Sequence, residues 1–204
     1  MEMEIRSDSV VLVGYVNVVL RNSKVLSSPR GKFVETVEER TFAKAIERAD
    51  NIFLLHNHRK DRVLGSIKDG NLELREDNIG LHARCEIRDA EVIQKAKDGL
   101  LKGWSFGFSK IKDEWQEGED GIDRRYLKDI VLHEVSILDV SPAYVATSVE
   151  MRDEDSTLIE QRNYELKIKN IETTEQVEEQ RADELVKTDL SALFDAENFI
   201  KTRR

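Results

Sequence analysis

The chain has 204 residues and a mass of 23.5 kDa, with 36% charged and 39% apolar residues and a formal net charge of −9 at pH 7. This length is enough for one domain with an appendage. The acidic balance argues against surfaces that bind nucleic acid or anionic membranes, because both need clustered basic residues. We therefore expect a protein or peptide partner.

The cysteine content and the N-terminus both indicate an intracellular protein. Cys85 is the single cysteine, which excludes an intrachain disulfide and fits a reducing compartment. It lies in "GLHARCEI", where apolar and polar residues alternate, so we expect a buried thiol on a strand and not a nucleophile. No basic segment precedes an apolar stretch, and no apolar run approaches about 18 residues, so we expect a cytoplasmic protein without a membrane span.

The first part of the chain predicts a buried strand, a loop and a helix. The valine-rich stretch 9–20 predicts a strand that is buried on both faces or forms one wall of a closed barrel. Asn, Ser, Pro and Gly in 21–37 predict a long loop. Apolar residues at helical spacing over 38–50 predict a short amphipathic helix, with Thr41 as a candidate N-cap.

Strands dominate the middle of the chain. A strand is predicted over 51–59, and 62–87 divides into two or three more at the turn sequences "KDG" and "EDNIG". A second helix is predicted within 88–103, with Asp89 as N-cap and Gly99 near its C-terminal end.

The last third changes character. A strand beginning at "WSFGF" is predicted to run to Trp115, and 124–143 predicts one or two more strands that end at Pro142. Residues 151–204 are rich in charge and have sparse apolar positions, so we expect a helical or disordered tail and not a second domain.

The segment "GWSFGF" (103–108) raises the question of what Ser105 does between aromatic residues and glycines. The glycines either allow a close backbone approach within a strand or clear space for a reacting serine. A serine hydroxyl becomes nucleophilic when a neighbouring base takes its proton and a third group orients that base.

The four histidines and one glutamate are the candidates for those roles. His82 falls on the polar face of its predicted strand, whereas His56 and His58 share one face of the 51–59 strand near its polar end. His133 directly precedes Glu134, so the two side chains should point to opposite faces. Each residue also has an ordinary role open to it, as a surface group or a salt-bridge partner.

Three strings, "LLHNHRKDRVLGSI", "GLLKGWSFGF" and "LHEVSILDVSPAYVAT", resemble in order and spacing the prohead (head maturation) serine proteases of tailed bacteriophages. The resemblance covers roughly residues 9–150. That family is similar to the herpesvirus assemblins, so the resemblance implies an α+β fold with an antiparallel β-barrel and a few surrounding helices.

The resemblance also implies roles for three residues. His58, which follows Asn57, matches the base, Ser105 matches the nucleophile, and Glu134 matches the third position. His133 is adjacent to Glu134 and chemically able to act in its place. Arg59 departs from the acidic residue that many relatives carry after the histidine, which we interpret as a difference on the surface or the substrate side.

The function implied by the resemblance is a serine endopeptidase without metal or cofactor. Its expected substrates are the scaffold or the scaffold-like segment of the major capsid protein, and its own chain, inside the phage procapsid in the host bacterial cytoplasm. We expect a protease domain over 1–150, a tail over 151–204 and a possible homodimer. Two alternatives are a non-enzymatic capsid assembly factor with a protease-like barrel and a small β-barrel binding module.

Overall fold

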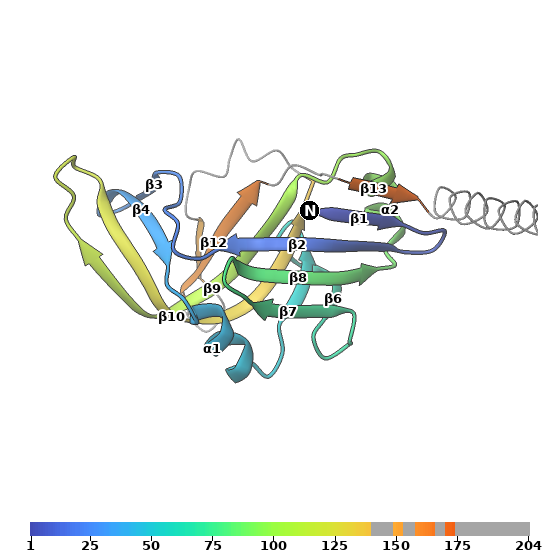
Figure 1. Ribbon diagram of the computed structural model, residues 1–204, viewed down its shortest axis with the longest axis horizontal. Coiled ribbons are helices and arrows are strands. Elements are labelled where there is room, and N and C mark those ends of the chain that lie inside the picture. The colour runs from blue at the N-terminus through green and yellow to red at the C-terminus, as the bar shows by residue number, and fades with distance from the viewer. Residues whose placement is uncertain (140–148, 153–157, 166–169, 174–204) are drawn as a thin grey trace, which may run out of the picture.

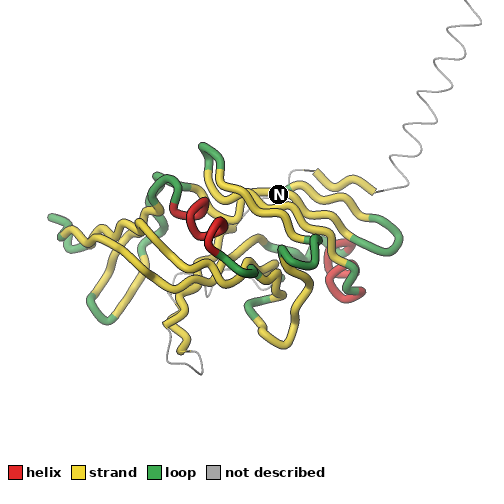
Figure 2. Tube along the Cα trace, turned by 90° about the horizontal axis from the view of Figure 1, so that it is seen from below, coloured by secondary structure: helices red, strands yellow, loops and turns green. Residues whose placement is uncertain are grey.

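The computed structural model describes residues 1–139, 149–152, 158–165 and 170–173. Strands form most of this described part, and it contains two short helices, α1 (Thr41–Arg48) and α2 (Ala90–Lys97) (Figure 1). The tube in Figure 2 shows that strands make up most of the path and that the two helices lie apart from each other. Neither α1 nor α2 has the length and apolar character that crossing a bilayer would require.

One sheet has five strands, arranged in the order β13-β1-β2-β8-β7. These strands are β1 (Glu2–Ile5), β2 (Val10–Val18), β7 (Leu72–Glu76), β8 (Gly80–Ile87) and β13 (Asn170–Thr173). The pairs β1–β2, β2–β8 and β7–β8 are antiparallel, whereas β1 and β13 are parallel.

The other sheet has eight strands and branches at its longest member. Its strands are β3 (Leu26–Ser28), β4 (Gly31–Val37), β5 (Phe53–His56), β6 (Arg59–Ser66), β9 (Gly103–Gln116), β10 (Asp123–Leu138), β11 (Val149–Arg152) and β12 (Leu158–Glu165). The main path runs β11-β12-β9-β10-β4-β3. Along β10, β4 pairs with the first residues and β5 with the last, and β6 extends β5.

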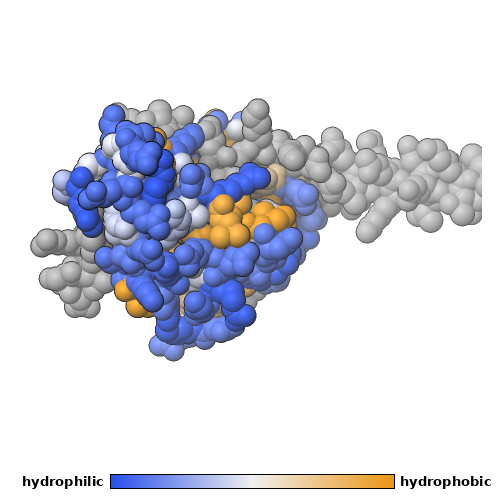
Figure 3. Space-filling view, turned by 60° about the vertical axis from the view of Figure 1, so that its left-hand side comes forward, coloured by the Kyte–Doolittle hydropathy of each residue, from blue (hydrophilic) through white to orange (hydrophobic). Residues whose placement is uncertain are grey.

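The apolar core lies on one face of β9. Trp104, Phe106 and Phe108 alternate along this strand and are fully buried in a cluster that includes Leu12 of β2. Phe42 of α1 packs edge-on against Phe106, with ring centroids 5.3 Å apart. Because side chains alternate along a strand, the residues between these aromatics face the opposite side of the sheet. The outer surface in Figure 3 is mostly hydrophilic around a small apolar patch.

Several predictions of local structure are confirmed. The stretch 62–87 contributes three strands, β6, β7 and β8. Cys85 is fully buried in β8, and burial raises its pKa to about 12, as expected for an inert thiol. Asp89 caps α2 by accepting the Val92 N–H at 3.0 Å, and Gly99 follows the helix with φ of 66°.

The predicted loop over 21–37 is wrong, because it contains β3 and β4. Phe33, Glu35 and Val37 alternate along β4 and are all buried on one face. Glycine and proline nearby indicated loop chemistry, but the alternation within "KFVETV" is that of a strand.

The predicted N-cap role of Thr41 is wrong, although α1 begins at this residue. The Thr41 hydroxyl donates to the Leu127 carbonyl at 3.2 Å and does not cap α1. Instead, the Glu76 carboxylate of β7 accepts the backbone N–H groups of Arg40 at 2.5 Å and Ala43 at 2.7 Å. The N–H groups at the start of α1 are therefore satisfied by a side chain that is distant in the sequence, and not by Thr41 as the local pattern predicted.

The predicted closed barrel is not observed, and the described strands form two open sheets. β13 and β7 lie at the edges of one sheet, and β3, β6 and β11 lie at edges of the other. The long strand β10 pairs with β4 along its first residues and with β5 along its last residues. The sheet therefore branches at β10, whereas the strands of a simple closed barrel form one unbranched ring. The broader α+β prediction agrees with the structure.

The N-terminus and the region after residue 150 contain strands that the sequence did not indicate. Met1, Met3 and Ile5 are buried around β1, where alternation with glutamates was present but short. The described parts of the predicted helical or disordered tail are β11, β12 and β13. Pro142 and 174–204 lie outside the described residues, and the domain boundary at 150 stays a prediction.

Candidate active site

His58 lies in the tight turn that joins β5 to β6. His56 pairs with Arg59 across this turn, and its two central residues, Asn57 and His58, have φ of 54° and 60°. Positive φ at both central positions is typical of a two-residue hairpin turn, and Asn and His tolerate it better than most residues do. The prediction that His56 and His58 share one face of a strand is therefore wrong, because the chain turns between them.

The turn brings His58 against Glu134 of β10. His58 Nδ1 lies 2.7 Å from Glu134 Oε1, and both side chains are about nine-tenths buried. Because an ionised carboxylate only accepts hydrogen bonds, the hydrogen of the neutral imidazole resides on Nδ1 and leaves Nε2 as the basic nitrogen. This is the arrangement that a general base requires.

Ser136 supports both members of this pair. Its hydroxyl donates to Glu134 Oε2 at 2.7 Å and accepts the backbone N–H of His58 at 3.2 Å. Ser136 lies two residues after Glu134, so both point to the same face of β10. Sequence analysis missed this residue, although the period of two within "EVS" was available to find it.

Ser105 and Gly107 occupy the adjacent positions on β9. Ser105 pairs with Ser136 and Gly107 pairs with Glu134 across the antiparallel ladder. Paired residues of neighbouring strands face the same side, so Ser105 lies beside the His58–Glu134 pair on the face opposite the aromatic core. The structure thus brings together the three residues that the sequence indicated, from β9, β10 and the β5–β6 turn.

The Ser105 hydroxyl itself points toward β12. It donates to the Arg162 carbonyl oxygen at 2.8 Å, and the whole residue is buried. Among the described residues, this is the one hydrogen bond made by the Ser105 side chain, so the serine–histidine bond of a catalytic triad is not formed here. The His58–Glu134 pair is formed, whereas the Ser105 hydroxyl is hydrogen-bonded to β12.

A buried ion cluster fixes β12 in this position. Glu35 of β4 accepts from Arg125 of β10 at 3.0 Å and from Arg162 of β12 at 2.7 and 2.9 Å. Glu160 of β12 binds both arginines. Burial opposes these charges, but the hydrogen bonds outweigh it, holding the pKa of Glu160 below 4.5 and raising those of Arg125 and Arg162.

The replacement Glu35→Ala should lower the free energy of unfolding by about 3–5 kcal/mol, because it removes a carboxylate shared by two buried arginines and leaves them with Glu160 and, for Arg125, Asp113. Glu38→Ala, at an exposed residue 3.5 Å from Lys128, should cost less than about 1 kcal/mol. Denaturant unfolding of both variants tests this, and equal losses would contradict it. The contribution of Glu160 should be complete above pH 4.5 and be lost as the pH falls, since its pKa is lowered on folding.

The other histidines do not contact Glu134 in this way. His133 Nε2 lies 2.7 Å from the Ser109 hydroxyl, His56 Nε2 lies 3.1 Å from Asp139 Oδ2, and His82 packs edge-on against Tyr15. His82 is half-buried on β8, and burial lowers its pKa. Of the two neighbours His133 and Glu134, the structure joins Glu134 to His58.

Gly107 leaves room for the Glu134 carboxylate. A Cβ atom added at residue 107 would collide with Glu134 Oε1. We expect Gly107→Ala to displace Glu134 and lower the rate of any reaction that uses His58 by about 10²-fold, since small misplacements at a site have effects of that size. The comparison variant is Gly70→Ala, at a turn glycine with φ of 74° and nothing near an added Cβ; its strain lies in the backbone of that turn, so its activity should stay within threefold of the unmodified protein.

Comparisons with known proteins indicate which family this chain resembles. Residues 1–162 match the family model described as caudovirus prohead serine protease. A protein named prohead protease, from Escherichia phage T5, is 32% identical over 93 residues. That match covers 44% of this chain and 41% of the relative, so it spans about two fifths of that protein. No solved structure matches the chain significantly.

Proposed function

The chain belongs to the caudovirus prohead serine protease family, and we propose that it is a serine endopeptidase that acts in phage head maturation. Ser105 is its nucleophile, His58 its general base and Glu134 the group that orients His58. The observation that carries this proposal is the 2.7 Å hydrogen bond between His58 and Glu134, formed directly beside Ser105 on the sheet.

The chemistry follows from these positions. His58 Nε2 takes the proton of Ser105 as its Oγ bonds to the carbonyl carbon of the substrate peptide, and Glu134 stabilises the imidazolium that forms. The peptide C–N bond then breaks, and the leaving amine takes the proton from His58. Water next hydrolyses the ester on Ser105 with His58 again as base, which returns the free hydroxyl.

Two changes must precede this reaction. The Ser105 hydroxyl must turn from the Arg162 carbonyl toward His58, and the buried serine must become accessible to a substrate. β12 supplies the Arg162 carbonyl, so a shift of β12 accomplishes the first change and contributes to the second. We therefore expect low activity from the isolated protein and higher activity under conditions that loosen β12.

The proposed substrates are the scaffold or the scaffold-like segment of the major capsid protein, together with this chain itself, inside the procapsid. The name of the phage T5 relative and the family description support this setting. Residues 151–204 are proposed to help carry the protease into the shell.

Intact-mass spectrometry of the protein mixed with its capsid protein tests this proposal. Discrete fragments that appear with the unmodified protein and are absent with Ser105→Ala would support the protease. Fragments that form equally with both proteins would place the nucleophile elsewhere. An absence of fragments, even inside assembled proheads, would favour the non-enzymatic assembly factor.

A further inference from the structure

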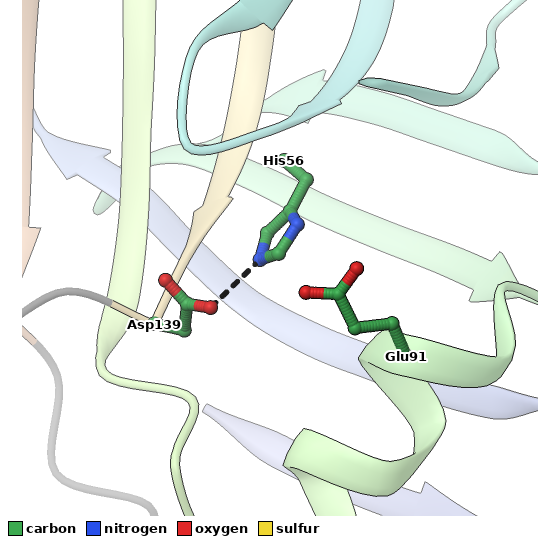
Figure 4. A group of neighbouring side chains, drawn as sticks. All are labelled: His56, Glu91 and Asp139. Atoms are coloured by element: carbon green, nitrogen blue, oxygen red, sulfur yellow. Dashed lines mark hydrogen bonds and ion pairs between the residues drawn. The ribbon is translucent and has the colours of Figure 1, made fainter.

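A second cluster of charged side chains lies next to the β5–β6 turn, which carries His58. His56 of β5, Glu91 of α2 and Asp139 at the end of β10 converge there, as Figure 4 shows. Their potential ligand atoms lie within 4.8 Å of one another, an arrangement that could suit a metal ion. However, the Lys95 ammonium donates to Asp139 and lies 2.7 Å from Glu91, so a cation of the protein already balances these carboxylates.

Asp139 is the residue that connects this cluster to the turn. Asn57 Nδ2 donates to Asp139 Oδ1 at 2.6 Å, and the Asp139 backbone N–H donates back to Asn57 Oδ1 at 3.1 Å. The other carboxylate oxygen, Oδ2, contacts His56 Nε2 and Lys95. Burial opposes the charge on Asp139, but the hydrogen bonds from Lys95 and Asn57 hold its pKa below the ordinary value.

The backbone of the turn explains why such a contact is needed. Asn57 and His58 both have positive φ, a conformation that persists in residues other than glycine when the surrounding contacts impose it. The Asn57 N–H also donates to the Ile137 carbonyl at 3.0 Å. Asn57 is therefore bound to the end of β10 through both its backbone and its side chain, one residue before His58.

We propose that Asp139 and Asn57 form a clamp that positions His58, keeping its Nδ1 directed at Glu134, with His56 and Lys95 holding Asp139 in place. Asp139 and Asn57 touch neither the nucleophile nor the substrate in this account, so they are positioning residues. The expected effect of the clamp on activity rests on the proposed function. Its effect on the His58–Glu134 hydrogen bond can be measured whether or not the protein is active.

The reciprocal pair allows a test by exchange. Asn57→Asp places a carboxylate opposite the Asp139 carboxylate and so removes the side-chain donor from this contact, whereas Asp139→Asn alone keeps an amide oxygen that accepts from Asn57 Nδ2. Combining Asn57→Asp with Asp139→Asn restores one donor and one acceptor at the contact, and aspartate, like asparagine, tolerates positive φ. Glu91→Gln is the matched control, because it changes the same cluster without touching the turn.

Proton–nitrogen NMR of histidine-labelled protein in a Ser105→Ala background reads the His58–Glu134 bond directly. We expect a downfield Nδ1–H signal, assigned by its loss in His58→Ala, that disappears in Asn57→Asp and returns in the combined variant. It should persist in Glu91→Gln. An unchanged signal in Asn57→Asp, or a signal that stays absent in the combined variant, would overturn the clamp.

Reactivity is measured separately, with Ser105 intact. The rate at which a fluorophosphonate probe modifies Ser105, under conditions in which the protein cleaves its capsid protein, should fall about 10²-fold in Asn57→Asp and recover to within about tenfold in the combined variant. If Ser105 of the unmodified protein does not react under those conditions, the proposed protease function fails. The NMR signal still decides the clamp in that case, so the two failures are distinguishable.

Discussion

Replacing Ser105 with alanine should lower the rate of capsid-protein cleavage by a factor of about 10⁴ to 10⁶, the usual cost of losing a member of a serine protease triad. The hydroxyl oxygen is the atom that bonds to the substrate carbonyl, and no other group at this position on β9 can replace it. The measurement is the rate of fragment formation, followed by mass spectrometry under conditions where the unmodified protein is active.

Two further variants make this result specific. His58→Ala should cause a similar loss, and the double variant should be no slower than either single one, because the two residues act as a unit. Ser109→Ala is the matched control, since Ser109 lies on the same strand and face but contacts His133. A comparable loss in Ser109→Ala, or additive losses in the double variant, would contradict the assigned roles.

The replacement Glu134→Gln should lower the same rate by about 10³ to 10⁴. Glutamine has nearly the same size, but its amide can present a donor to His58 Nδ1, where the carboxylate only accepts. The imidazole would then carry its hydrogen on Nε2, the nitrogen that must receive the serine proton. Loss of the negative charge also removes the stabilisation of the imidazolium.

Glu114→Gln is the control for this change, because Glu114 is an exposed carboxylate on β9 that pairs with Lys128. Its cleavage rate should stay within twofold of that of the unmodified protein. If Glu134→Gln retained activity within tenfold and His133→Ala lost it, His133 would replace Glu134 as the third member. The 2.7 Å contact of His58 with Glu134 argues for the opposite outcome.

Local sequence patterns predicted the strands in which apolar and polar residues alternate and the helix whose capping residue directly precedes it in the sequence. β8 and α2 are examples, because the alternation around Cys85 and the side chain of Asp89 lie within the elements they define. β12 could not be recognised in this way. Charged residues such as Glu160 and Arg162 are typical of a solvated segment. In the structure they are buried against Arg125 and Glu35, partners more than 30 residues away in the sequence.

The resemblance indicated His58, Ser105 and Glu134 as candidate site residues, but not the geometry that joins them. The structure brings the three residues together on one side of the sheet. The sequence could not separate His56 from His58 by strand alternation, because the backbone turns at Asn57. It also could not indicate that the Ser105 hydroxyl bonds to a backbone carbonyl of β12, since carbonyl groups leave no residue signature.

The central claim is that Ser105 is a nucleophile activated by His58. Labelling with a fluorophosphonate probe, under conditions in which the protein cleaves its capsid protein, tests it most directly. The account predicts a single adduct that peptide mapping assigns to Ser105, and no adduct in the His58→Ala variant. Continued cleavage with Ser105 unmodified, or equal labelling of the His58→Ala variant, would contradict it.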